Sequence, residues 1–485
     1  FGLAPAGYSY TRQNGIFYQH GGTVNVSSLH TGSLSPGNAY TIYSGILNAG
    51  GIQVGSIDPS HFYQYGGQVN AGSLGVGGSF SGSRYYLNNG ILNVTNTIRV
   101  GGNQGDNNFF QEAGTNRVSY LVIGPSDYGA ATYVLNGGLL CTGDVLIPPA
   151  GREGYLDQNG GVHIVTNTLT VIGNFERYSR ADSAYRLNSG VLSAGQLDLA
   201  GGSLSLRDAT IANFGLLQVR GGTYDADAAG SIFIPGGKLA CANLIHEGSG
   251  GAHISQTGGE FIVTNLFSFG GVGGFYRLSS LQYNFTGGTL MASNIELAAD
   301  MMIGSSTNTG RITNPGYFKM AGKLTVGDAT EQLGRFILTS NSIINLGDGR
   351  AKLSFANSSA EVWNSGTILT ITNWNGSPNG GGADQLKFGS KSSGLSSGQV
   401  SQIRFIDPSG ASLARILTTG EVVPLERPNL SRVQVGNNLV LSWTGNLSLQ
   451  TATNVTGPYL DLPDATSPYT NDMTASPERY FRLRQ

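Results

Sequence analysis

The residues best suited to acid–base or cation chemistry lie in one short segment, Thr-Tyr-Asp-Ala-Asp-Ala. Asp225 and Asp227 alternate with alanine, so an extended strand would turn both carboxylates to one face. A polysaccharide hydrolase or lyase needs such carboxylates, often beside a basic residue or Ca²⁺. A solvated loop explains the segment more simply, and Asp348 in Gly-Asp-Gly-Arg is expected in a turn. We therefore predict no catalytic, cofactor-binding or metal-binding residue and no enzyme activity.

The other reactive side chains support the same prediction. The histidines lack the spacing of a metal site, and His163 falls at a position expected in the core. Cys141 and Cys241 lie four repeats apart, about 19 Å at ~4.8 Å per repeat, which is beyond the reach of a disulfide. Cys141 should point outward, as a free thiol or as a cross-link between two molecules, and Cys241 should point inward.

A glycine-anchored repeat organises the chain that carries these residues. The clearest anchors are separated by 22 to 29 residues, and weaker copies follow them. The clear anchors are Gly22, Gly45, Gly67, Gly90, Gly114, Gly138, Gly161 and Gly190, and the weaker ones are Gly222, Gly237, Gly259, Gly288 and Gly322. A fixed period of this size is typical of stacked units that cannot bury their apolar faces alone.

Around each anchor, apolar and polar residues alternate. An aromatic lies five residues before the glycine, and apolar side chains follow two and four residues after it, which predicts strands with one buried face. The aromatic column comprises Phe17, Tyr40, Phe62, Tyr85, Phe109, Tyr133 and Tyr185. Asparagine recurs six residues after the anchor and suits a corner where stacked amides bond to one another. This ladder comprises Asn96, Asn167, Asn243, Asn265 and Asn294.

Two strands and a polar loop in about 23 residues predict one turn of a parallel β-solenoid. Three residues before the anchor, glutamine alternates with an apolar residue, as in Gln19, Ile42, Gln64 and Leu87. The alternation leaves two interpretations open: turns of about 23 residues derived from a two-turn ancestor, or a wide turn of about 46 residues. We favour the small turn, because short coils bury a compact core with little loop.

The direction of the aromatic column also stays open. An outward column would form a stripe on which sugar rings could stack, whereas an inward column would stabilise the core. The Gly-Gly pair can break the alternation, so residue parity alone does not decide between them. We favour the inward column.

The repeat weakens after residue 346, and the composition changes again near residue 426. Residues 1–350 are predicted to form the β-solenoid, 351–425 its C-terminal cap, and 426–485 a small antiparallel β-sandwich. In that last segment we expect strands at 438–443, 447–452, 459–462 and 480–484. The expected fold class is therefore all-β.

The composition of the chain limits the classes of binding partner and the cellular location that we expect for the protein. Charged residues make up only 12% of the chain and the formal net charge is −2, so no basic surface for nucleic acid or anionic lipid is expected. No apolar stretch is long enough for a transmembrane helix, and we expect no membrane insertion. The first residue is Phe, and we expect a mature chain after removal of a signal peptide, located outside the cell or on its surface.

Four segments resemble a known family. The phrases YYLNNGILNVTNTIRVGG and YLDQNGGVHIVTNTLTVIGN resemble the autotransporter-type β-strand repeats of large secreted bacterial proteins. The segment from SSAEVWNSGTILTITNW to TTGEVVP is similar to the conserved end of such proteins from bacteria with sorting-signal export systems, and the tail ending in ERYFRLRQ is similar to their terminal module. The resemblance implies secretion, a β-solenoid and a role at the surface or in the extracellular matrix, without catalytic residues.

Two functional hypotheses lead. The first is an extracellular structural protein that assembles end to end with copies of itself into a filament or surface matrix, since an uncapped strand edge is a template for another chain. The alternative is a surface adhesin that binds cells or extracellular polysaccharide, which requires outward aromatics. A polysaccharide-degrading enzyme is the weakest hypothesis and would require a groove with carboxylates such as Asp225.

Overall fold

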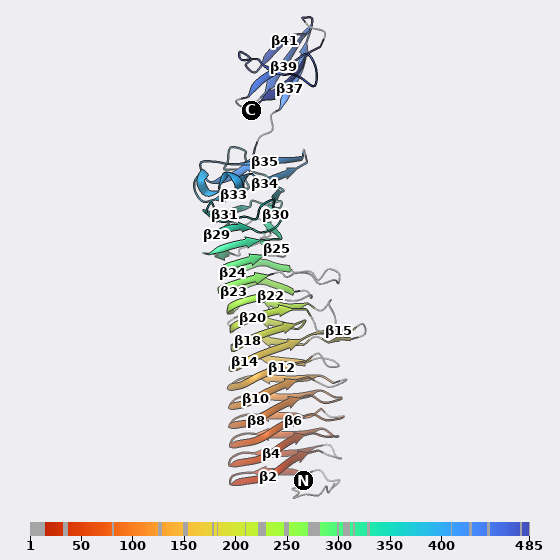
Figure 1. The fold of residues 1–485 in the computed structure, drawn as a ribbon. Coiled ribbons are helices and arrows are strands. Elements are labelled where there is room, and N and C mark those ends of the chain that lie inside the picture. Colours follow the sequence, from red (N-terminus) through yellow and green to blue (C-terminus); the bar gives the residue numbers. More distant parts are fainter. Residues whose placement is uncertain are drawn as a thin grey trace.

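The fold is a rod of stacked β-strands (Figure 1). The computed structural model describes residues 15–32, 37–79, 82–124, 129–148, 154–176, 179–181, 183–208, 210–221, 229–246, 252–269, 282–297, 300–303, 311–313, 316–326, 330–408, 410–425, 429–443, 447–475 and 478–484. The chain is 65% strand and 2% helix, and about 12 turns form a parallel β-solenoid. The all-β prediction is confirmed.

Each of the first ten turns consists of a short strand followed by a long one. The short strands are β1 (Ile16–Gln19), β3 (Asn38–Ile42), β5 (Ser60–Gln64), β7 (Arg84–Leu87), β9 (Asn107–Gln111), β11 (Ala131–Leu135), β13 (Gly154–Gln158), β17 (Ala184–Leu187), β19 (Ser203–Leu206) and β21 (Gly230–Ile234). The long strands are β2 (Thr23–Thr31), β4 (Ile46–Val54), β6 (Gln68–Val76), β8 (Ile91–Val100), β10 (Thr115–Ile123), β12 (Leu139–Ile147), β14 (Val162–Ile172), β18 (Gly190–Ala200), β20 (Thr210–Arg220) and β22 (Lys238–His246). A two-stranded antiparallel excursion, β15 (Asn174–Glu176) and β16 (Ser179–Ala181), leaves the rod between β14 and β17.

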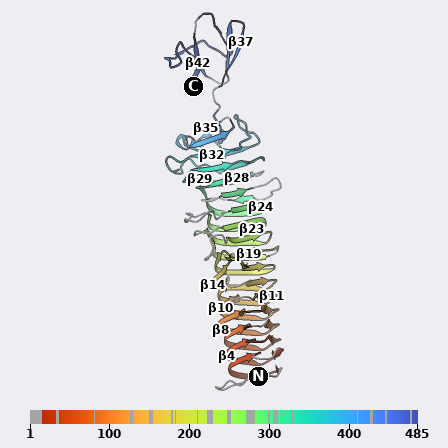
Figure 2. The same ribbon diagram turned by 90° about the vertical axis from the view of Figure 1, so that its right-hand side faces the viewer.

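Parallel pairing between neighbouring turns settles the size of the turn. Thr23 pairs with Ile46 and Ile46 pairs with Gln68, so each turn lies directly on the previous one after 22 or 23 residues. The wide turn of 46 residues is excluded. Viewed from the side, the turns stack in chain order from the N-terminal end (Figure 2).

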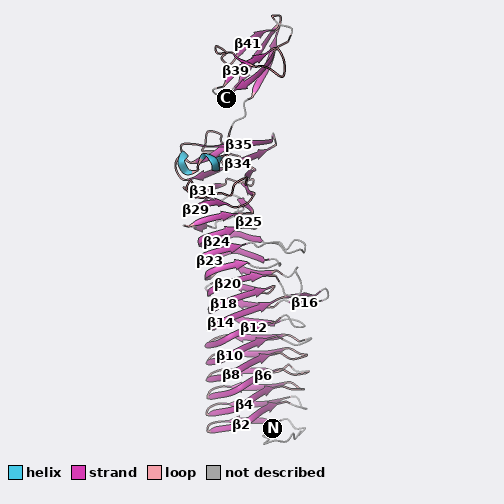
Figure 3. Ribbon diagram, viewed as in Figure 1, coloured by secondary structure: helices cyan, strands magenta, loops and turns pink. Residues whose placement is uncertain are grey.

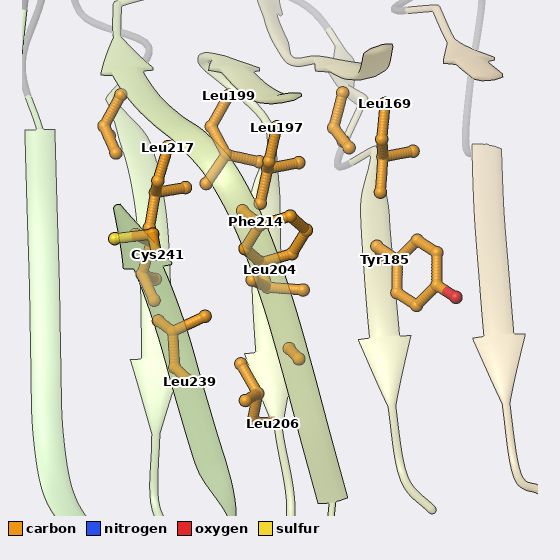
Figure 4. Close-up of a cluster of buried hydrophobic side chains, with 14 of the residues drawn as sticks. Leu169, Tyr185, Leu197, Leu199, Leu204, Leu206, Phe214, Leu217, Leu239 and Cys241 are labelled. Carbon is orange, nitrogen blue, oxygen red and sulfur yellow. The ribbon is translucent and has the colours of Figure 1, made fainter. Parts of the chain in front are cut away.

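The core runs without a break along the inside of the solenoid. In the short strands the residues five and three before the anchor point inward, and in the long strands those two and four after it do, as the period of two predicts. Figure 4 shows one section of this core, where Leu197, Phe214, Leu217, Leu239 and Cys241 pack between strands of successive turns. The two cysteines are free thiols, with Cys241 buried and Cys141 on the outer face and half-buried.

The anchor glycines make the bend between the two strands. At Gly67 φ is +71°, and a Cβ atom there would lie 2.6 Å from the carbonyl oxygen of Gly45 in the turn below. Both the left-handed backbone and the close approach of stacked turns therefore exclude a side chain. In the turn after Gly190 the anchor position is occupied by Thr210, which pairs with Gly190. The anchor assigned to Gly222 lies outside the described residues.

The register of the repeat changes after Gly288. The next strands are β23 (Ala252–Phe269), β24 (Gln282–Leu297), β25 (Asp300–Ile303), β26 (Arg311–Thr313), β27 (Tyr317–Met320) and β28 (Lys323–Val326). β28 pairs with β25, which pairs with the first part of β24, while β27 pairs with its last part. The assignment of Gly322 as an anchor, with Tyr317 and Leu324 around it, is therefore wrong. Apolar and polar residues alternate in the same way in the strands on every side of a turn. Residue spacing alone therefore does not reveal that a strand has moved to another side.

Parallel turns continue beyond the boundary predicted at residue 350. They comprise β29 (Thr330–Leu338), β30 (Ser342–Asn345), β31 (Lys352–Ala356), β32 (Leu369–Thr372), β33 (Gln385–Phe388) and β34 (Ile403–Asp407). Antiparallel strands then close the solenoid, with β35 (Gly410–Ile416) joining β34 to β36 (Glu421–Pro424). A one-turn helix, α1 (Ser397–Val400), and the 3-10 turn Ser392–Gly394 lie beside this end (Figure 3).

Buried carboxylates hold the glycine-rich loop of the cap. Glu421 accepts hydrogen bonds from the backbone N–H of Gly381 at 3.1 and 3.2 Å. Asp384 accepts from the backbone N–H groups of Ala351 at 2.9 Å and Asn375 at 2.7 Å. Both carboxylates therefore serve the backbone of the closing loop.

The C-terminal module consists of two three-stranded antiparallel sheets, as predicted. The first contains β37 (Leu430–Val435), β38 (Asn438–Trp443) and β41 (Tyr469–Asp472), and the second β39 (Ser448–Ala452), β40 (Leu460–Asp461) and β42 (Tyr480–Arg484). Leu441, Trp443 and Leu449 form a small core of their own. Of the four strands expected here, all are present to within a residue or two, and β37 and β41 were not anticipated.

Candidate functional site

The aromatic column lies inside the solenoid. Phe17 is half-buried, and the other six residues of the column are 2% exposed or less. From Phe17 to Tyr133 the rings stack with centroids 4.6–5.0 Å apart. Leu156 takes the next place before Tyr185. This column therefore cannot form an outward stripe for sugars.

A hydrogen bond between turns explains the alternation along this column. The hydroxyl group of Tyr85 donates to Oε1 of Gln64, in the turn below, at 2.8 Å, and both side chains are fully buried. Nε2 of Gln64 donates onward to the backbone carbonyl of Ile91 at 2.9 Å. The same pairing recurs between Tyr40 and Gln19, Tyr133 and Gln111, Tyr185 and Gln158, and Tyr283 and Gln256. Burial raises the pKa of Tyr85 well above its ordinary value, so the hydroxyl stays a donor.

Two of these tyrosines have a further buried partner. Asn116 donates from Nδ2 to the hydroxyl oxygen of Tyr133 at 2.9 Å. Two turns later His163 takes the same place, with Nδ1 2.9 Å from the hydroxyl of Tyr185 and Nε2 3.2 Å from Oγ1 of Thr142. Since Tyr185 donates its proton to Gln158, Nδ1 of His163 must carry a hydrogen. Burial lowers the pKa of His163 to about 3, and the prediction of a core histidine is confirmed.

The predicted asparagine ladder is only partly continuous. Nδ2 of Asn265 donates to Oδ1 of Asn243 at 2.8 Å, and Asn294 donates to the backbone carbonyl of Asn265 at 3.0 Å. Asn167 bonds instead to Asp144, at 3.1 Å. Asn96 is exposed in a stretch where β8 contains one residue more than its neighbours β6 and β10. Only Asn243 and Asn265 therefore bond amide to amide as predicted.

Two longer ladders were missed in the sequence. Asn48, Asn70 and Asn93 each donate from Nδ2 to Oδ1 of the asparagine one turn below, ending at Asn25, over 2.8–3.0 Å. The second ladder runs from Asn188 through Asn159 and Asn136 to the carboxylate of Glu112, over 2.9 Å at each step. The signal is present in the sequence, because these residues lie three after or two before the anchor.

A shallow groove follows the first ladder along the solenoid. Asparagines, alanines and glycines make up most of its lining. It is lined by Asn25, Val26, Ser27, Asn48, Ala49, Gly50, Asn70, Ala71, Gly72, Asn93 and Thr95. The lining carries no charge, so the groove could only offer hydrogen bonds and apolar contacts to an extended chain.

A second set of aromatics, also missed, lies on the outside of the first turns. His20, Tyr43 and Tyr65 stack at 4.8 and 5.2 Å, two residues before the anchors. Tyr63 and Tyr86 stack at 5.0 Å in the neighbouring column, which Phe110 continues at 5.1 Å. The rings are nearly parallel, within 11°. Their faces therefore cover one another, and ring edges and hydroxyl groups meet the solvent.

Unpaired strand edges of the described residues lie on the first turn of the solenoid and on the outer strands of the tail module, β37, β40, β41 and β42. Among the described residues, β1 pairs only with β3 and β2 only with β4, so the first turn has one unpaired side. Core-facing Val24 and Val26 are accordingly half-buried there. In the tail module, β37 pairs only with β38 within the described chain, and it exposes Val433 by 62% and Val435 by 60%.

The groups considered for catalysis are not brought together. Asp225 and Asp227 lie outside the described residues, and Asp348 lies in a turn, as expected. In the part of the chain that the structure describes, no three His, Cys, Asp or Glu residues are grouped as metal ligands. Within the same part, no helix has the length and apolar character to cross a membrane.

Comparisons with known proteins yield no relative. No family model, no curated protein and no solved structure matches the chain. The class that the structure defines is thus a parallel β-solenoid repeat protein with a small antiparallel C-terminal module.

Proposed function

We propose that this chain is an extracellular structural protein whose rods join end to end with copies of themselves. The observation that carries the proposal is the pair of strand edges, one on the first described turn and one on β37 of the tail module. Unpaired N–H and C=O groups along an edge are a template for another strand. The β37 edge of one copy against β1 or β2 of the next would pair both.

The closed end of the solenoid determines which contact is available. Antiparallel strands β35 and β36 cover the last turn, so a second copy cannot stack its turns directly on that end. The tail module must make the contact instead. A contact between two different surfaces that does not close into a ring produces a filament.

The resemblance to autotransporter-type repeats of secreted bacterial proteins supports the proposed location outside the cell. The outer surface fits the proposed structural role. Along the amide ladders, side-chain hydrogen bonds join neighbouring turns in addition to the backbone hydrogen bonds. The role needs no catalytic group and no cofactor.

Electron microscopy of the full chain over a range of concentrations tests the proposal. The wild type should form chains of rods with a regular axial repeat of one molecule. In V433K/V435K, two charges on the exposed strand should block pairing at the β37 edge and leave single rods. V455K is the matched control, because Val455 is 61% exposed but lies outside the strands of the same module.

Two results would contradict the proposal. The first is a wild type that remains as single rods at every concentration, and the second is assembly of V433K/V435K like that of the wild type. Sedimentation velocity of the same samples gives an independent measure of assembly.

Glycan binding is the second candidate, and the outer aromatics of the first turns favour it. Tyr18, Tyr43 and Tyr65 are 54%, 43% and 47% exposed. A polysaccharide would meet hydroxyl groups and ring edges rather than open ring faces. Retention on immobilised polysaccharides that falls in Y43A/Y65A and persists in Y459A, on the tail module, would support this function; equal retention of all three proteins would contradict it.

A further inference from the structure

Four tyrosines on the outside of the second, third and fourth turns form one contiguous group, the outer tyrosine cluster. Tyr43 stacks on Tyr65 with ring centroids 5.2 Å apart and planes at 9°, and Tyr63 stacks on Tyr86 at 5.0 Å and 6°. Tyr63, on β5, and Tyr65, just after β5, have ring centroids 6.2 Å apart and join the two pairs. Tyrosine thus contacts tyrosine between adjacent turns, at the surface.

The core column avoids this arrangement over the same turns. Phe62 lies between Tyr40 and Tyr85, and Phe109 lies between Tyr85 and Tyr133. Each core hydroxyl is also committed to a buried glutamine. Within the described part of the solenoid, the outer cluster combines adjacent phenols with access to solvent, since Tyr43 and Tyr65 are nearly half exposed.

We propose that the outer tyrosine cluster is an oxidative cross-linking site, at which a peroxidase with hydrogen peroxide joins Tyr43 to Tyr65 as dityrosine within one chain. Tyr63 and Tyr86 form the second pair of the same site. The product is a covalent link between adjacent turns, in addition to their hydrogen bonds.

The chemistry balances with one peroxide for each link. Each phenol loses one electron and one proton to the peroxidase, which leaves two phenoxyl radicals, and the peroxide is reduced to two waters. The radicals couple through a bond between their Cε carbons, ortho to the oxygens. The hydrogen on each of these carbons then moves to the phenolic oxygen, which restores both aromatic rings.

The geometry permits the bond after a small change. Parallel in-register strands hold the two tyrosines one strand spacing apart, about 4.8 Å, and both side chains point the same way. The rings must turn from face-to-face to edge-to-edge by rotation about Cβ–Cγ. Exposed side chains have the room for that rotation, whereas the fully buried core rings lack it.

The experiment treats the dilute full-length protein with peroxidase and hydrogen peroxide and analyses the monomer fraction. The expected result is a monomer lighter by two hydrogens per link, with dityrosine fluorescence and a cross-linked peptide pair containing Tyr43 and Tyr65. Y65F keeps the ring stack but removes the reactive phenol, so this peptide pair should disappear. Y18F is the control, because Tyr18 is equally exposed but stacks on His20 rather than on a tyrosine.

The second pair keeps the test informative. In Y65F the link between Tyr63 and Tyr86 should persist, and Y65F/Y86F should lose both peptide pairs. Cross-links found only between molecules, or a Tyr43 link that persists in Y65F at the wild-type yield, would overturn the proposal. A treated monomer without loss of hydrogen would overturn it as well.

Discussion

Acidification should destabilise the turns around His163 more than the rest of the solenoid. Its imidazole is fully buried between Thr142 and Tyr185, and burial lowers its pKa from 6.5 to about 3. Above pH 6.5 the ring is neutral in both the folded and the unfolded chain, so it contributes no pH dependence. Between pH 6.5 and 3 the unfolded chain binds a proton that the folded chain does not, so the free energy of unfolding falls as the pH falls.

The magnitude follows from the separation of the two pKa values. Each pH unit below 6.5 costs about 1.4 kcal/mol. At pH 4.5 the loss is therefore about 3 kcal/mol, and at pH 3 it is about 4 kcal/mol. Repeat proteins unfold locally, so the measurement should be local too: hydrogen exchange of the amides in β13, β14 and β17, with those in β6 and β8 as an internal reference.

The protein supplies its own control two turns earlier. There Asn116 takes the place of His163, and Val94 takes the place of Thr142. The variant H163N/T142V reproduces that arrangement and should show no additional loss of protection between pH 7 and 4.5. If wild type and variant lose protection equally over this range, the reasoning about His163 is refuted.

Three further predictions concern the core and the bends. For the buried pair Tyr85 and Gln64, Y85F and Q64L should each lower the free energy of unfolding by about 1–3 kcal/mol, because a buried polar group loses its partner. The double variant should lose less than the sum of the two single variants. Local hydrogen exchange measures these losses, and additive effects would contradict the prediction. Gly67→Ala should cost at least about 2 kcal/mol through its left-handed φ and the contact with the turn below, measured as a lower melting temperature. Burial raises the pKa of Cys241 to about 12, so iodoacetamide at pH 8 should alkylate Cys141 alone in the native protein, and equal labelling would contradict the burial of Cys241.

The sequence predicts the turns because their signals are local. Alternating apolar residues and a glycine at the bend can be recognised within a single repeat, and they also place His163 in the core and Cys141 on the outer face. In the tail module the same alternation predicts four of the six strands, but not β37 or β41. The alternation of glutamine with leucine was visible too, but its cause was not, since Tyr85 bonds to the glutamine of the preceding turn.

The parts that were missed depend on contacts between turns. Outward-facing side chains contact one another only when one turn lies on another, as Asn25 to Asn93 do through hydrogen bonds and Tyr63 and Tyr86 do through ring stacking. The register change after Gly288 depends on which side of the turn each strand occupies, which alternation does not encode. The turn with Thr210 in place of the anchor glycine lacks the residue that marks the repeat in the sequence.

The amide ladders give the surface of the rod a dipole along its axis. Every asparagine in the two long ladders except the terminal Asn25 donates toward the preceding turn, so the side-chain dipoles align and their positive ends face the N-terminal end, as in a helix. In the second ladder the carboxylate of Glu112 occupies that positive end and accepts the last hydrogen bond. In the first ladder the last member is Asn25, at the edge of the first described turn, and its Oδ1 accepts from Asn48. An acceptor oxygen on whatever covers that edge would extend the row, whereas a cation there would meet the repelling end of the dipole.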